Sequence, residues 1–502
     1  MMALKPLIAI CGTTGVGKSK LAVELALRLS QDNPSREWKG AKIVNADAMQ
    51  AYKGLDVITN KMPVEDRKGV DHLLMDFKEA GEQYVVGQWV NDAMDAIDDM
   101  HGRKEIPIVV GGTSYWLQHL VFPNRLAAEP FGSHASVVPS PRSRELVEAL
   151  SRLSLEHREL FNALPSSPPS AADEPASAFQ LYSLLAALDP AISSRWHWRD
   201  TRKVLRSLIL LKETGKKPSL IYQEQSQTAV APRYRALFLW LYSDPIALNP
   251  RLEQRIDEMI KNGLLAEVVE MRTLASTRHD SHLSIADYTV GVYQSIGFKE
   301  FSGYLDDPTR AEDSYVAAVT GMKNSTRRYA KRQVSWIRNK LLPAIYAANT
   351  SALPSNEGPH AYLLDASDPE MWHTCVQTLA TNISEAFLTC SDLPNPRSLS
   401  RVAESMLSVK DKPTSAEAVL QARKKFTCPV CSVDASRPVM LEEGLEWDAH
   451  EKTRAHRRLA RRSKREMPSQ TVWAHPELEN ASVGDIACDA AAGLPTPAGG
   501  LI

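Results

Sequence analysis

The stretch "CGTTGVGKSK", residues 11–20, decides the fold of this chain. It contains the spacing Gly-x4-Gly-Lys-Ser, follows the apolar run "PLIAIC" and leads into the amphipathic segment "GKSKLAVELALRLS". This order of strand, loop and helix is typical of a phosphate-binding loop, whose backbone N–H groups and helix N-terminus surround phosphate oxygens. Lys18 supplies a charge for the terminal phosphate and Ser19 a hydroxyl for Mg²⁺, but the spacing leaves the identity of the phosphate ester open. The residues expected to form the loop are Gly12, Thr13, Thr14, Gly15, Val16, Gly17, Lys18 and Ser19.

The composition is that of a soluble chain with several domains. Its 502 residues exceed one compact core, and 43% hydrophobic and 24% charged residues are ordinary values. Because the net charge is only −1, nucleic-acid binding would depend on local basic patches. The six cysteines are too few and too unevenly placed for a secreted disulfide framework. No apolar run reaches the ~18 residues of a membrane span, so we expect no membrane partner and cytoplasmic residence, with the mitochondrion and the nucleus left open.

Two further apolar runs predict strands of a parallel α/β sheet. "AKIVNAD" ends in Asp47, and "IPIVVGGTSYWLQHL" passes through a Gly-Gly-Thr turn at Thr113 into a helix. The carboxyl ends of parallel strands form one edge, where ligands bind. At this edge Asp47 could hold magnesium or act as a general base, or it could be a turn aspartate with a structural role. The residue pattern does not distinguish the functional from the structural interpretation. Thr113 similarly offers a hydroxyl at this edge or a tight strand-to-helix turn.

The fold predicted from these patterns is a phosphate-loop, parallel-sheet core with a helical insertion domain and a C-terminal C2H2-type zinc finger. The predicted divisions are 1–124 for the first part of the core, 125–235 for the insertion with a flexible Pro/Ser/Ala-rich loop, 236–390 for the rest of the core with basic helices, 391–423 for a linker, 424–466 for the finger and a basic helix, and 467–502 for a disordered tail.

The zinc prediction depends on Cys428-x2-Cys431 and His450-x5-His456, which are separated by eighteen residues. Two thiolates and two imidazoles are a usual tetrahedral Zn²⁺ set, and four filled positions indicate a structural ion. We expect the cysteines on a turn and the histidines on a following helix. The basic run "RRLARRSKR" comes next, so the module suits either an accessory RNA contact or a protein contact stabilised by zinc.

Seven segments in order resemble the tRNA dimethylallyltransferase (tRNA isopentenyltransferase) family, over roughly residues 6–345 and in its eukaryotic form with a C-terminal zinc finger. They are "GTTGVGKS", "DAMQAYKGLDVITNK", "VDHLLMDF", "VVGGTSYWLQHL", "RWHWRDTRKVLRSL", "QSIGFKEF" and "TRRYAKRQVSWIR". The chain departs from the family at Thr13, Gly15 and Ala48, where the family usually has proline, alanine and serine.

The resemblance implies transfer of the prenyl group of dimethylallyl diphosphate to the N6 amine of the adenosine on the 3′ side of a tRNA anticodon, by a monomeric enzyme with Mg²⁺. It implies that Asp47 is the general base and that Lys18, Ser19 and Arg255 stabilise the leaving diphosphate. Arg255 by itself also fits a solvated helix arginine, and Arg328 and Arg332, one turn apart, also fit a solvated basic face. The resemblance implies that the anticodon stem-loop contacts Asp47, Ala48, Met49, Gln50, Thr113, Asp200, Thr201, Arg202, Lys203, Val204, Gln294, Ser295, Ile296, Gly297, Phe298, Lys299, Arg328 and Arg332.

Two other functions share part of these features. A small-molecule kinase would have the same loop and core, but it does not explain "DAMQAYKGLDVITNK" or the helix at 326–338. A non-catalytic RNA-binding adaptor built on the finger predicts a decayed loop, whereas Lys18 and Ser19 are both intact.

Overall fold

The computed structural model describes residues 4–31, 37–123, 143–227, 231–276, 291–350, 358–409 and 424–466. The tail predicted for 467–502 lies outside these residues, as does the second part of the predicted linker. Among the described helices, none combines the length and the apolar composition that crossing a membrane requires.

The centre of the structure is a six-stranded sheet in the order β3-β2-β4-β1-β5-β6, in which all neighbouring strands are parallel. Its strands are β1 (Pro6–Gly12), β2 (Gly40–Asn45), β3 (His72–Leu73), β4 (Glu105–Val110), β5 (Arg235–Tyr242) and β6 (His360–Asp365). The predicted class, a parallel α/β core, is confirmed. The three strands expected from the sequence are β2, β4 and β1, which are adjacent, so their carboxyl ends meet at one edge.

Alternate residues of β1 serve two hydrophobic cores, one on each face of the sheet. Leu7 and Ala9 face a core built with α2 (Val86–Gly102) and α3 (Ser114–Val121). Ile8 and Ile10 face the other core, built with α1 (Lys18–Leu29) and α15 (Leu379–Leu388). Because both faces are covered, the strands are nearly continuous hydrophobic runs, as parallel strands generally are.

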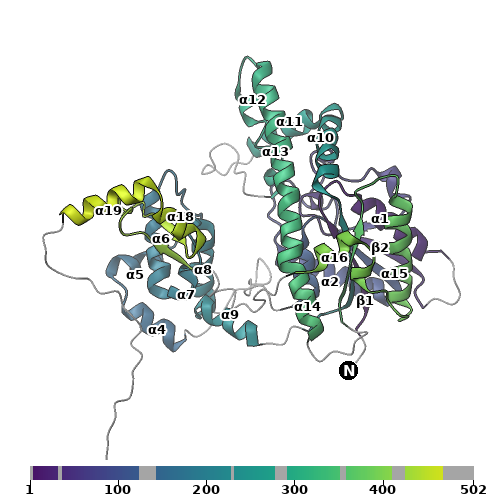
Figure 1. The fold of residues 1–502 in the computed structure, drawn as a ribbon, viewed down its shortest axis with the longest axis horizontal. Coiled ribbons are helices and arrows are strands. Elements are labelled where there is room, and N and C mark those ends of the chain that lie inside the picture. Colours follow the sequence, from purple (N-terminus) through teal and green to yellow (C-terminus); the bar gives the residue numbers. More distant parts are fainter. Residues whose placement is uncertain are drawn as a thin grey trace, which may run out of the picture.

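The remaining helices of the core pack around this sheet, with α13 the longest (Figure 1). They are η1 (Met49–Ala51), η2 (Val64–Arg67), α10 (Pro245–Lys261), α11 (Leu264–Ser276), η3 (Gly291–Gln294), α12 (Ser302–Asp306), α13 (Glu312–Trp336), η4 (Ile337–Leu341), α14 (Leu342–Thr350), η5 (Trp372–Thr378), η6 (Pro396–Ser398) and α16 (Arg401–Leu407). The start of the predicted linker is thus not a linker. Ala403 and Leu407 of α16 are buried in the core, and the Tyr346 hydroxyl donates to the Leu407 carbonyl over 2.7 Å.

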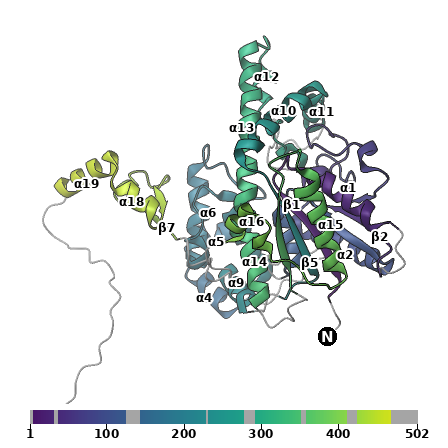
Figure 2. The same ribbon diagram turned by 45° about the vertical axis from the view of Figure 1, so that its right-hand side comes forward.

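Residues 143–227 form a helical unit with a hydrophobic core of its own. Its helices are α4 (Arg144–Ser151), α5 (Leu155–Asn162), α6 (Pro175–Leu188), α7 (Pro190–Ser193), α8 (Thr201–Thr214) and α9 (Pro218–Gln227). Part of the predicted flexible loop belongs to α6, where Ala178 is fully buried. In Figures 1 and 2 this unit lies beside α13 and α14, away from α1 and α15.

The C-terminal module contains an antiparallel pair, β7 (Lys425–Thr427) and β8 (Met440–Glu442), followed by α18 (Leu445–Glu451) and α19 (Arg454–Glu466). It contacts the helical unit directly. The Trp198 indole N–H donates to the Pro438 carbonyl over 2.8 Å, and the Lys425 amide donates to the Ser194 carbonyl over 2.7 Å. Met440 packs with Ala178 and Trp198, so the contact has a small hydrophobic centre.

Gly111 provides a test of how tightly the ends of β2 and β4 meet. A Cβ at this position would lie 2.1 Å from the carbonyl carbon and oxygen of Ala46. We expect Gly111→Ala to destabilise the protein by about 1–3 kcal/mol, as overpacking does, and to lower the midpoint of thermal unfolding. Gly102→Ala is the control, because a Cβ there meets nothing within 4 Å. Equal midpoints for the two variants would contradict this close approach.

Candidate active site

Asp47 lies just beyond the carboxyl end of β2, and backbone hydrogen bonds fix its position. The Ala46 amide donates to the Val110 carbonyl (2.8 Å), and the Thr113 amide donates to the Ala46 carbonyl (3.2 Å). The Asp47 carboxylate accepts a hydrogen bond from the Met49 amide over 3.1 Å. Asp47 therefore makes the contact of a turn aspartate and also lines a cavity, as a magnesium ligand or general base must.

Asp47 belongs to a small group of partly buried charges. Burial raises the pKa of Asp47, and the nearby charges of Lys18 and Arg255 oppose that rise. Burial lowers the pKa of Lys18 to about 8, and the Asp47 carboxylate limits that fall. Burial also lowers the pKa of Arg255, whose Nε has no hydrogen-bond partner among the described residues. Arg255 lies on α10 and lines a cavity together with Asp47, so it is not the solvated helix arginine that the sequence left open.

A cavity of about 290 Å³ is lined by Asp47, Arg255 and Thr14 of the loop. Apolar side chains such as Ile58, Ile256 and Met322 form one part of its wall, and Tyr329 with Thr326 of α13 forms another. Burial raises the pKa of Tyr329 and the Asp47 charge adds to the rise, so the phenol keeps its proton and can donate it in a hydrogen bond. The predicted site residues that line this cavity are Thr14, Asp47, Ala48, Met49, Thr113, Arg255, Gln294, Ser295, Ile296 and Arg332.

Gln333 connects the two loops that flank this cavity. Its carboxamide oxygen accepts from the Thr14 amide over 2.9 Å, and its nitrogen donates to the Gly112 carbonyl over 3.0 Å. The side chain is almost fully buried. Gly112 is needed beside it, because a Cβ there would lie 2.6 Å from the Gln333 nitrogen and 3.2 Å from an Asp47 carboxylate oxygen.

The phosphate-binding loop has the backbone that its glycines predict. Gly12, Gly15 and Gly17 all have positive φ angles, which favour glycine. The Lys18 ammonium bends back and donates to the Thr13 carbonyl over 2.6 Å. Within the loop expected at residues 12–19, the Thr14 amide donates to Gln333 and therefore does not face a phosphate in this structure. Thr13 faces a second cavity, of about 900 Å³, lined also by Arg327, Arg328 and Lys331.

The Asp200–Val204 group does not lie in the Asp47 cavity. Asp200, Thr201, Arg202 and Lys203 line a separate cavity of about 1020 Å³, together with Arg199 and Arg206 of the same unit and residues near the start of α2. Val204 is buried in the core of the helical unit, so its side chain supports α8 and does not face a ligand.

The remaining expected residues are divided between exposed and buried positions. Lys299, Arg328 and Arg332 are exposed, and Arg328 and Arg332 line different cavities. Gly297 and Phe298 are buried, and Phe298 belongs to the main core, so direct contact of its side chain with RNA is ruled out. The Gln50 carboxamide donates to the carbonyls of Thr59 and Asn60, and thus holds the loop beside the cavity.

Thr113 and Ala48 contact each other at the rim of the Asp47 cavity. The Thr113 hydroxyl accepts a hydrogen bond from the Ala48 amide over 3.2 Å. Thr113 therefore stabilises the turn and lines the cavity at the same time.

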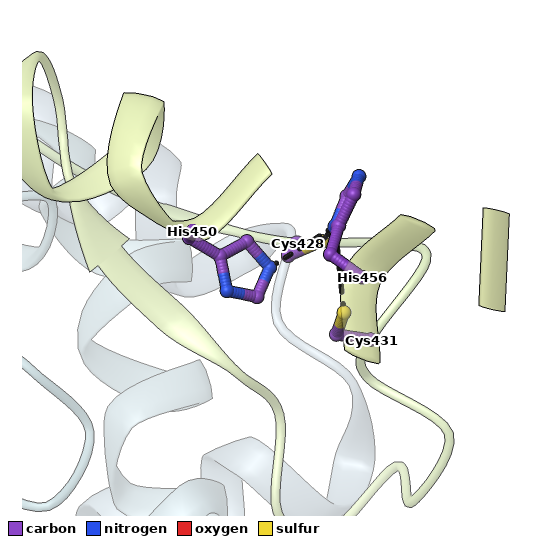
Figure 3. Close-up of side chains that lie close together, drawn as sticks. All are labelled: Cys428, Cys431, His450 and His456. Atoms are coloured by element: carbon purple, nitrogen blue, oxygen red, sulfur yellow. Dashed lines mark hydrogen bonds between the residues drawn. The ribbon is translucent and has the colours of Figure 1, made fainter. Parts of the chain in front are cut away.

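Cys428, Cys431, His450 and His456 come together in the C-terminal module, as Figure 3 shows. Their ligand atoms all lie within 4.8 Å of one another, and the group can hold a metal ion. The cysteines are on a turn, as expected, but the histidines are on two helices, α18 and α19, and not on one. Six residues advance a helix by about 600°, so on one continuous helix the two imidazoles would point in different directions. The helix is instead interrupted near Thr453, whose hydroxyl accepts a hydrogen bond from the His456 amide.

Several residues of the site were not expected from the sequence. Tyr329 and Gln333 lie four residues apart on α13, inside the segment "TRRYAKRQVSWIR" from which only the arginines were selected. Helical spacing with Thr326 could have found this face. Ile58, Met259 and Met322 gave no signal, because they are ordinary apolar residues whose place depends on tertiary packing.

The comparisons with known proteins agree with the segments quoted above. A family model described as IPP transferase matches residues 50–340. The tRNA dimethylallyltransferase of Schizosaccharomyces pombe is 33% identical over 474 residues, which cover 92% of this chain and 96% of that protein. The human protein of the same name is 31% identical over 397 residues, covering 76% and 74%. A solved structure of a eukaryotic dimethylallyltransferase acting on tRNA has a TM-score of 0.69 and 31% identity, and covers 92% of this chain and 98% of its own.

The lowered pKa of Lys18 makes anion binding at the loop depend on pH. The ammonium loses its proton as the pH rises through about 8, so its attraction for a diphosphate is present below that value and is lost above it. We expect the affinity for inorganic diphosphate to fall more steeply for the wild type than for Lys18→Arg between pH of about 7 and about 9, since arginine stays charged. Isothermal titration calorimetry measures both affinities. Equal slopes would contradict the assignment.

Proposed function

The chain belongs to the IPP transferase family, and we propose that it transfers the dimethylallyl group of dimethylallyl diphosphate to the N6 amine of the adenosine on the 3′ side of a tRNA anticodon. The products are N6-isopentenyladenosine in the tRNA and free diphosphate. The observation that supports this function most directly is a cavity in which the Asp47 carboxylate lies with Arg255 and with Thr14 of the phosphate-binding loop. The names of the relatives and of the solved structure agree with it.

In the proposed reaction the carbon–oxygen bond of the diphosphate ester breaks and a carbon–nitrogen bond to N6 forms. Asp47 accepts the N6 proton as general base, and the raised pKa brings the carboxylate closer to the working pH of a proton acceptor. Lys18 and Arg255 stabilise the charge that develops on the diphosphate. Because both cations are partly shielded from water, their attraction for an anion is stronger than it would be on an open surface.

The residues of the loop also fit a magnesium ion. Ser19 is only partly buried at the first turn of α1, directly after Lys18, so its hydroxyl is available as a hard oxygen ligand. When bound, Mg²⁺ would neutralise part of the diphosphate charge. Lys18 and Arg255 provide the charge stabilisation that the chain itself supplies.

The adenine must leave its stack to reach Asp47, because a base held between its stacked neighbours cannot enter the cavity that Asp47 lines. Enzymes that modify such a base extrude it into a pocket. The cavity of about 290 Å³, with its apolar wall and the Tyr329 phenol, fits a flat base of that kind. Arg332 lies at its rim, and Arg328 lies one turn earlier on α13. Both side chains are exposed and suited to phosphate contacts, which dominate RNA affinity.

We propose that the Cys428 group holds one structural Zn²⁺. The Nδ1 atom of His456 lies 3.5 and 3.4 Å from the two sulfurs and 3.1 Å from Nε2 of His450. Tetrahedral ligands at ~2.0–2.3 Å from Zn²⁺ are ~3.3–3.8 Å apart; the two distances to sulfur fall in this range, and the distance between the two nitrogens is slightly shorter. Zinc would thereby fix the basic helix α19 next to the helical unit. Hydrogen bonds of Trp198 and Lys425 already connect that unit to the C-terminal module. A monomeric state and cytoplasmic residence stay predictions.

Asp47→Asn tests the general base. Asparagine keeps the shape of the side chain but cannot accept the N6 proton, so we expect kcat to fall by about 10²–10⁴-fold while tRNA affinity changes little. Incorporation of radiolabelled dimethylallyl groups measures the rate, and filter binding measures the affinity. The control is Asp95→Asn, an exposed aspartate of α2.

The same comparison has a pH signature. Burial raises the pKa of Asp47, so the wild-type rate should fall with decreasing pH already above the usual aspartate range. That acidic limb should be missing in Asp47→Asn. Full transfer by Asp47→Asn would exclude the general-base role.

Cys431→Ser tests the zinc site, with Cys390→Ser as the matched control, since Cys390 is an exposed free cysteine outside the group. We expect one zinc per chain in the wild type and in Cys390→Ser, by mass spectrometry of the metal, and a large loss in Cys431→Ser because one of four ligands is removed. tRNA affinity should fall with the zinc, while the KM for dimethylallyl diphosphate stays the same. Retention of zinc by Cys431→Ser would show that the four residues do not form the metal site.

A further inference from the structure

Trp372 lies against the phosphate-binding loop on the side away from Asp47. It is the first residue of η5, in the segment that follows β6, and thus comes from the carboxyl edge of the sheet that carries the loop. A Cβ on Gly17 would lie 2.7 Å from Cη2 and 2.8 Å from Cζ3 of the indole. The ring therefore covers the backbone of the loop where the helix begins.

Contacts to the first two turns of α1 hold this ring in place. The Lys20 ammonium lies 4.5 Å from the ring centroid, a cation–π contact. The indole N–H donates to a Glu24 carboxylate oxygen over 3.0 Å, and Lys20 and Glu24 form an ion pair at 4.0 Å. Because Glu24 is mostly buried, with 18% of its side chain exposed, the arrangement is more constrained than a surface ion pair.

The direction of the loop shows which end of a ligand this ring would meet. Lys18 bends back to Thr13 and lies near the charges of Asp47 and Arg255. The terminal phosphate of a ligand would therefore lie near the first residues of the loop. The residues after Ser19, including Lys20, therefore mark the opposite end. In a nucleotide complex the α-phosphate lies in the cradle, and the nucleoside leaves it toward that opposite end and the neighbouring strand ends.

We propose that Trp372 determines the specificity of the loop by filling the space that a nucleoside would need. A nucleoside diphosphate or triphosphate then meets the indole, whereas a diphosphate whose organic group points toward the Asp47 cavity does not. The choice among phosphate esters, which the Gly-x4-Gly-Lys-Ser spacing leaves open, is made by a residue more than 350 positions further along the chain. The identity of the accepted ester rests on the proposed function, but the exclusion of nucleosides does not.

Trp372→Ala tests this proposal by direct binding of ADP and of inorganic diphosphate, each with Mg²⁺, in isothermal titration calorimetry. We expect the variant to bind ADP at least about tenfold more tightly than the wild type, because a steric barrier is removed, with diphosphate affinity within about threefold. Trp372→Phe keeps an aromatic ring and should stay selective. His373→Ala, at the exposed neighbouring residue, is the control.

A ring that serves only packing predicts a lower unfolding temperature for Trp372→Ala and no gain in ADP affinity, and that result would overturn the proposal. If Trp372→Ala does not fold, the affinities of the wild type for ADP and for diphosphate test the proposal. ADP binding as tight as diphosphate binding would overturn the proposal, and ADP binding at least about tenfold weaker would support it. Selective binding of diphosphate without prenyl transfer to tRNA would reject the proposed function and leave the exclusion of nucleosides intact.

Discussion

A single buried carboxamide, that of Gln333, connects the two halves of the site. It accepts from the Thr14 amide and donates to the Gly112 carbonyl, so α13 joins a loop 319 residues earlier in the chain to a turn 221 residues earlier. Buried backbone groups without partners are costly, and these two groups therefore constrain the distance between the phosphate-binding loop and the Gly-Gly-Thr turn. The Asp47 cavity lies between the same elements, and its shape depends on this connection.

Partial burial and mutual attraction set the charges of the site. The Asp47 carboxylate opposes the effect of burial on the pKa of Lys18 and of Arg255, and both cations oppose the effect of burial on the pKa of Asp47. The two cations share one carboxylate, so a bound anion would compensate their charge, and a proton donor would compensate the charge of Asp47. Trp372 covers the opposite side of the loop, and Asp47 with its cavity occupies the side that stays open, so the organic group of the ligand and the acceptor amine are brought to the same place.

Local patterns were enough to predict the family, the parallel core, the position of Asp47 and the clustering of the four Cys and His residues, because each depends on spacing within a short segment. The remaining features depend on contacts between distant segments. The places of Gln333 and Trp372 follow from packing on loops far away in sequence, and the burial of Phe298 and Val204 from cores that one motif does not reveal. Residues 401–407 lack a clear pattern but form a helix because Ala403 and Leu407 fill the main core. The break between α18 and α19 brings His450 and His456 to the same two cysteines, which the spacing of one continuous helix would not do.

The measurement that tests the central claim most directly is the identity of the nucleoside formed. The protein is incubated with Mg²⁺, dimethylallyl diphosphate and unmodified tRNA, and the tRNA is then digested to nucleosides and analysed by liquid chromatography with mass spectrometry. The account predicts that adenosine carrying one five-carbon prenyl unit appears, that it maps to the anticodon loop, and that omission of dimethylallyl diphosphate abolishes it. Unmodified adenosine in every tRNA tested, with the protein folded and loaded with zinc, would contradict the account.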